Sequence, residues 1–99
     1  MKITVYAIYD TVAAMYKAPF MMRSDGEALR GFADLAVSDE NDIGRHPSHF
    51  QLFKLAVFDD GSGIYSSNTP ELLATAQDMV AQAQRPLEAE PAVDLEAVN

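Results

Sequence analysis

The chain has 99 residues, a net charge of −8 and no cysteine, and 48% of its residues are hydrophobic. This composition indicates one small globular protein and excludes disulfide frameworks and thiolate metal sites. No stretch approaches the roughly 20 apolar residues that a membrane helix needs, and the first residues lack a signal-peptide pattern.

The negative charge is concentrated at the C-terminal end. The residues after Arg85 include four acids and no base. We therefore expect a single α+β domain over residues 1–85 and an acidic, disordered tail over residues 86–99. An acidic chain does not attract nucleic acid over long distances, so any DNA binding needs a local basic patch with aromatic stacking.

The first quarter of the chain predicts two strands. Residues 2–9 alternate, with Ile3, Val5 and Ala7 on one side, which is typical of a strand. Residues 10–18 form a connection, in which residues 12–16 offer an alternative helical turn. Residues 19–23 are short, apolar and extended, and they begin at a proline, as edge strands tolerate.

A helix is predicted to begin at Ser24. Ser24 and Glu27 have the spacing of a capping box, in which each side chain accepts from a backbone N–H at the helix start. An apolar stripe then continues to about Ser38. Gly31 lies in the middle of this helix, where glycine costs about 1 kcal/mol relative to alanine. Close packing of a neighbouring strand or helix is one reason for it.

The second half predicts a loop, two strands and a helix. Residues 40–48 are polar, whereas residues 50–58 are apolar on both faces and predict a central strand. A turn at residues 59–63 leads into a short strand at 64–66. Thr69 and Pro70 then predict the start of a second helix that runs to Arg85.

The resulting order is ββαββα: a small antiparallel β-sheet of about four strands with one or two packed helices. One helix covers only one face of the central strand, so either the second helix or another subunit must cover the other face. We therefore expect a homodimer or higher oligomer.

The sequence contains few candidate residues for catalysis or metal binding. His46 and His49 lie three residues apart in a loop without further ligands, so we expect no metal site. Nucleophile and phosphate-loop motifs are absent from the sequence. We expect neither a cofactor nor enzymatic activity.

Aromatic and basic residues form the remaining pattern. Rings on a sheet with nearby cations make a stacking platform for single-stranded nucleic acid. The alternative is that the rings are core or subunit interface, with Lys54 reaching to the rim from a face that also holds Leu52 and Phe58. The candidate stacking residues are Tyr6, Tyr16, Phe50 and Phe53, and the candidate phosphate contacts are Lys2, Lys17, Arg23, Arg30 and Lys54.

Several segments in order resemble one phage family: YAIYDTVA, APF, DGEALRGFADL and FQLFKLAVFDDGSG. Over about residues 3–63 the chain is similar to the small nonstructural protein of gokushovirus-type microviruses, which are single-stranded DNA phages. The resemblance implies a DNA-binding protein of the host cytoplasm that acts in genome synthesis or packaging. The alternative is an assembly factor that contacts phage or host proteins, with the acidic tail as one contact, and binds no nucleic acid.

Overall fold

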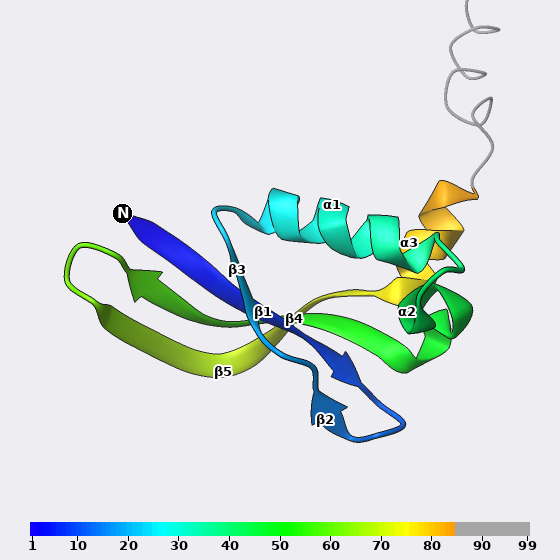
Figure 1. Ribbon diagram of the computed structural model, residues 1–99, viewed down its shortest axis with the longest axis horizontal. Coiled ribbons are helices and arrows are strands. Elements are labelled where there is room, and N and C mark those ends of the chain that lie inside the picture. Colours follow the sequence, from blue (N-terminus) through cyan, green and yellow to red (C-terminus); the bar gives the residue numbers. More distant parts are fainter. Residues whose placement is uncertain (85–99) are drawn as a thin grey trace, which may run out of the picture.

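The computed structural model describes residues 1–84, apart from the side chain of Asn68, and shows an α+β fold (Figure 1). The expected fold class, an antiparallel sheet with packed helices, is confirmed. The expected tail at 86–99 lies outside the described residues. The elements are β1 (Lys2–Asp10), β2 (Met15–Tyr16), β3 (Phe20–Met22), α1 (Asp25–Ala36), α2 (Asp42–Arg45), a 3₁₀ turn (Pro47–His49), β4 (Phe50–Asp59), β5 (Ile64–Thr75) and α3 (Ala76–Ala83).

The five strands form one antiparallel sheet in the order β2-β1-β4-β5. β4 is central, as the sequence predicts, and pairs with β1 from Asp59 to Phe50. β2 and β3 share the opposite edge of β1, because Tyr9 pairs with Tyr16 and Tyr6 pairs with Phe20. β2 replaces the alternative helical turn in the first connection.

The start of α1 follows from the predicted cap. The Ser24 hydroxyl accepts from the Glu27 N–H at 3.2 Å, and the Glu27 carboxylate accepts from the Arg23 N–H at 3.1 Å. The reciprocal bond therefore reaches one residue further back than expected. The next loop holds a short helix, α2, where the Asn41 side chain accepts from the N–H groups of Ile43 and Gly44.

The second predicted helix begins later than the sequence indicates. Thr69 and Pro70 lie inside β5, which continues to Thr75, and the helix α3 starts at Ala76. Thr75 is the cap, because its hydroxyl accepts from the Asp78 N–H at 3.1 Å. The expected start at Thr69 is wrong because backbone pairing with β4 extends the strand to this point.

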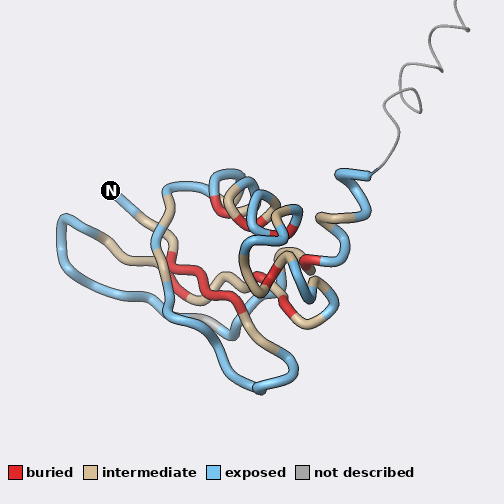
Figure 2. The backbone as a smooth tube through the Cα atoms, turned by 45° about the vertical axis from the view of Figure 1, so that its right-hand side comes forward, coloured by how far each residue is buried: buried red, intermediate tan, exposed pale blue. Residues whose placement is uncertain are grey.

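The core lies on one face of the sheet. Tyr6, Ile8 and Leu52 pack with Ala28 and Phe32 of α1, and α2 and α3 add residues to the same cluster. All three helices therefore lie over this face, which we call the covered face (Figures 1 and 2). No helix within residues 1–84 has the length and apolar character needed to cross a membrane.

The opposite face of the sheet, which we call the open face, has no helix over it in the described part of the chain. Successive strand residues point to opposite sides, so Val5 and Ala7 of β1 belong to this face. The sequence left open whether the second helix or another subunit covers it. In residues 1–84 that helix, α3, packs beside α1 on the covered face instead.

Candidate nucleic-acid interface

A β-bulge in β4 determines which side chains reach the open face. Lys54 pairs with Tyr6 and Ala56 pairs with Val5, so Leu55 has no partner on β1. One extra residue reverses the alternation of a strand. Phe58 therefore lies on the open face beside Tyr65 of β5, with the two ring centres 4.7 Å apart. The expectation that Phe58 shares a face with Lys54 and Leu52 is wrong for this reason.

Three aromatic rings meet on the open face at the β2 side of the sheet. Tyr9 lies 4.8 Å from Tyr16 and 6.1 Å from Phe53, and Tyr16 lies 5.7 Å from Phe53, all between ring centres. Each contact is edge-to-face, as the ring quadrupoles favour. Tyr16 is 40% exposed, and the other two rings are half-buried. We call these three residues the aromatic cluster.

Two predicted stacking residues lie in the core. Tyr6 is fully buried, stacks on Phe20 with ring centres 5.8 Å apart, and donates from its hydroxyl to Asp25 at 2.6 Å. Phe50 is 3% exposed. Neither ring is accessible to a base, so the structure removes Tyr6 and Phe50 from the candidate surface. Sequence reasoning missed Tyr9, although its odd position in β1 already placed it opposite Tyr6.

Lys54 belongs to a polar network on the covered face. Its ammonium lies 3.0 Å from Asp25, the first residue of α1, which also accepts from Tyr6. Hydrogen bonds from Tyr6 and then Lys54 lower the pKa of Asp25. Burial, and then the bond to Asp25, raises the pKa of Tyr6 to about 12. The network joins the start of α1 to β1 and β4, and it neutralises Lys54 as a phosphate contact.

Lys17 is also paired with a carboxylate. Its ammonium lies 3.0 Å from Asp42 of α2, and the hydrogen bond from Lys17 lowers the pKa of Asp42. The same ammonium lies 5.4 Å from the centre of the Phe50 ring. The pair is solvent-exposed, and exposed pairs contribute only about 0–1 kcal/mol, so a phosphate can compete for Lys17 at little cost.

The remaining predicted phosphate contacts are solvent-exposed. Lys2 begins β1, Arg23 follows β3, and Arg30 lies on α1. None of the three forms an ion pair with another residue of the described range. They do not gather around the aromatic cluster, because Lys2 is at the opposite end of β1 from Tyr9 and α1 belongs to the other side of the sheet. Lys2 begins β1 on the covered side of the sheet, and Arg23 directly follows β3, so both lie at strand ends on the rim of the sheet.

In the part of the chain that the structure describes, the open-face residues that pair with a neighbouring strand have no charged side chain. The register places the charged strand residues on the covered side: Lys2, Asp10, Lys54, Asp59 and Glu71. Exposed apolar side chains also contribute to the open face. They are Met21 at 43%, Leu72 at 50% and Tyr65 at 58%. The open face therefore offers aromatic and apolar contacts at its centre and cations only at its rim.

The two histidines stack on each other with ring centres 5.3 Å apart beside the 3₁₀ turn. No group of three or more potential metal-ligating side chains occurs among residues 1–84.

A family model described as phage ORF5 protein matches residues 3–79 of the chain. The chain belongs to this phage ORF5 protein family. The match begins in β1 and ends inside α3, so it includes both faces of the sheet and extends past the segments that carry the sequence resemblance. Neither a search of curated proteins nor a search of solved structures gave a match. The protein is thus a phage protein.

Proposed function

We propose that this phage ORF5 family protein binds single-stranded DNA without strong sequence preference, in genome synthesis or packaging. The observation that supports the proposal is the aromatic cluster on a sheet face that no described helix covers. Every base has a π-face, so stacking on Tyr16 and Phe53 tolerates any sequence and contributes about 1–3 kcal/mol per base. Unpaired bases reach such a surface, whereas bases inside a duplex do not.

The rim cations supply the phosphate contacts in this proposal. Lys17 follows Tyr16 directly, and Lys2 and Arg23 lie at the ends of neighbouring strands. With two or three such contacts, the logarithm of the affinity falls with the logarithm of salt concentration with a slope of about −2. The acidic body makes this electrostatic contribution small, so stacking supplies most of the affinity.

The test is a low-salt titration of a fluorescently labelled single-stranded oligonucleotide, followed by anisotropy. We expect Phe53→Ala to weaken binding about tenfold, the equivalent of losing one stacked base. The control is Val37→Ala, which removes an exposed apolar side chain at the end of α1. Absence of binding at about 100 μM full-length protein, or equal binding by Phe53→Ala, would contradict the proposal.

The strand residues of the open face are uncharged, and this favours a second candidate function, the binding of a protein partner. Apolar and aromatic residues with few charges are typical of interface centres. A second copy of the chain, or another phage or host protein, would then cover the open face. Light scattering on the wild type and on Phe53→Ala distinguishes the two. A loss of mass with unchanged DNA affinity supports the protein partner, and a loss of DNA affinity at unchanged mass supports the first proposal.

A double substitution, Lys2→Glu with Arg23→Glu, tests the same choice through charge. The DNA proposal predicts weaker oligonucleotide binding and a flatter salt dependence. The protein-partner proposal predicts no change in mass, because neither side chain lies at a paired position of the open face.

A further inference from the structure

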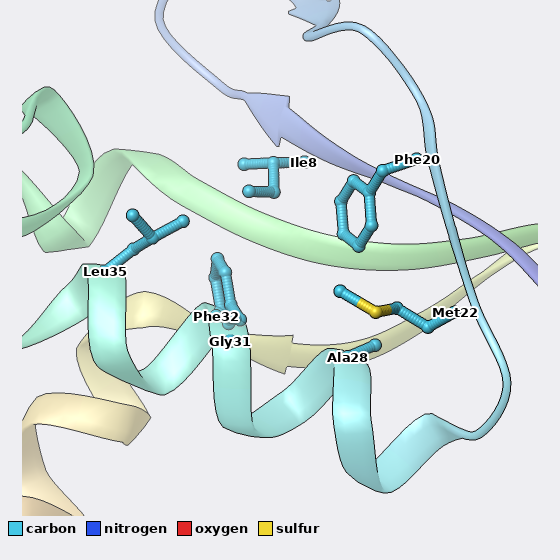
Figure 3. Close-up of a pocket in the computed structure, with 7 residues that line it drawn as sticks. All are labelled: Ile8, Phe20, Met22, Ala28, Gly31, Phe32 and Leu35. Carbon is cyan, nitrogen blue, oxygen red and sulfur yellow. The ribbon is translucent and has the colours of Figure 1, made fainter.

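An apolar groove lies between β3 and α1, away from the open face. Its volume is about 270 Å³, and the residues that line it are all apolar: Ile8, Phe20, Met22, Ala28, Gly31, Phe32 and Leu35. Figure 3 shows the side chains of β1 and β3 facing those of α1 across it. A dry cavity of about 150 Å³ already holds benzene, so this groove has room for one or two aliphatic side chains.

Gly31 keeps the groove open. A Cβ atom at this position would meet nothing within 4 Å. The close packing that the sequence suggested as a reason for a mid-helix glycine is therefore not present in the described structure. Gly31 instead borders open space, and any larger side chain there would extend toward the groove.

We propose that residues 93–98 of this same chain occupy the groove. This segment alternates apolar and acidic residues, with Val93 and Leu95 around Asp94. In an extended segment, alternate side chains point to opposite sides, so Val93 and Leu95 enter the groove together while the carboxylates remain at its edge. The inference does not depend on DNA binding.

Charge complementarity supports this occupant. Arg23 follows the lining residue Met22, and Arg30 precedes the lining residue Gly31. Both guanidinium groups are exposed and form no ion pair within residues 1–84. The residues from 86 onward carry four acids and no base, so they match two unpaired cations beside an apolar groove.

The distance also permits docking within one molecule. Gln84 lines a shallow surface pocket together with Ala36 and Val37, so the described chain ends beside the C-terminus of α1. The groove begins at Leu35 and extends to Ala28, about 10 Å along the helix at 1.5 Å per residue. Val93 is the ninth residue after Gln84, and nine extended residues span up to about 30 Å.

The test uses the full-length chain with a spin label on Asn99→Cys, which lies just outside residues 93–98 and is the sole cysteine in that variant. Met22 lines the groove, whereas its neighbour Met21 is exposed and pairs with Val5 of the open face. We expect the label to broaden the ¹³C-methyl resonance of Met22 much more strongly than that of Met21, because the broadening falls steeply with distance. Equal broadening of both, or none at Met22, would overturn the proposal.

Two further samples make the test specific. In the labelled chain, Leu95→Ser should abolish the broadening at Met22, whereas the matched change Leu87→Ser should not. A mixture of labelled ¹²C chains and unlabelled ¹³C-methyl chains should show no broadening, because the contact is within one molecule. Broadening that survives Leu95→Ser, or that arises between molecules, would overturn the assignment to residues 93–98 of the same chain.

Discussion

The covered and open faces of the sheet are built from the same strands, yet they differ in what lies over them. On the covered face, Leu52 of β4 is fully buried beneath α1 and α3. On the open face, its neighbour Phe53 is half-buried in an aromatic cluster with no described helix over it. The difference shows that buried core positions and exposed contact positions alternate along one strand, so substitutions at neighbouring residues should affect stability to different degrees.

The largest expected difference between the faces is in stability. Leu52→Ala removes a fully buried side chain and should lower the free energy of unfolding by about 2–5 kcal/mol. Phe53→Ala removes a half-exposed ring and should cost about 1 kcal/mol. Urea denaturation followed by circular dichroism measures both. Equal losses would mean that the open face is as well covered as the other.

Gly44 tests how closely the helices of the covered face pack. A Cβ atom there would lie 1.6 Å from the Ser38 carbonyl oxygen, so the backbone must move. Gly44→Ala should cost about 3 kcal/mol. The control is Gly26→Ala in the first turn of α1, where the nearest atom would lie at 3.8 Å and where alanine should be neutral or stabilising. Similar thermal midpoints for the two variants would contradict this packing.

The bond between Tyr6 and Asp25 gives a smaller effect. Tyr6→Phe keeps the buried ring but removes the hydroxyl that donates to Asp25 at 2.6 Å. The free energy of unfolding should fall by about 1 kcal/mol. Tyr65→Phe removes an exposed hydroxyl on the open face and should change it by less than about 0.5 kcal/mol. A stability loss from Tyr65→Phe equal to that from Tyr6→Phe would contradict the exposed position of the Tyr65 hydroxyl.

The pH dependence of stability is expected to be the smallest effect. The pKa of Asp25 lies below 3.8 in the folded protein, so its carboxylate stabilises the fold above about pH 4. This contribution is lost as the pH falls through the folded-state pKa. Asp25→Asn should therefore reduce the difference in unfolding free energy between pH 7 and pH 3, by less than about 1 kcal/mol because the pair with Lys54 is partly exposed. An unchanged difference would contradict the assigned role of Asp25.

Patterns within single segments predicted much of the fold. The alternation of β1, the cap at Ser24 and the two-sided apolar character of β4 each depend on adjacent residues, and each appears in the structure. The start of α3 could not be predicted this way. Thr69 and Thr75 both resemble helix caps, and only pairing between β4 and β5 decides in favour of Thr75.

The candidate surface was harder to predict than the fold. The bulge at Leu55 reverses the side on which Phe58 lies, and its position depends on the partner strand rather than on the local sequence. The ion pairs of Lys17 and Lys54 join residues 25 and 29 positions apart, so no local pattern reveals that both cations are already engaged. Tyr9, by contrast, was predictable from alternation alone.

Resonance mapping of the full-length protein during titration with a single-stranded oligonucleotide tests the open face most directly. The aromatic resonances of Tyr9, Tyr16 and Phe53 should shift with increasing oligonucleotide, while those of Tyr6 and Phe50 beneath the helices stay in place. Shifts confined to the helical side, or no shifts anywhere at about 100 μM protein in low salt, would contradict the assignment of nucleic-acid binding to the open face.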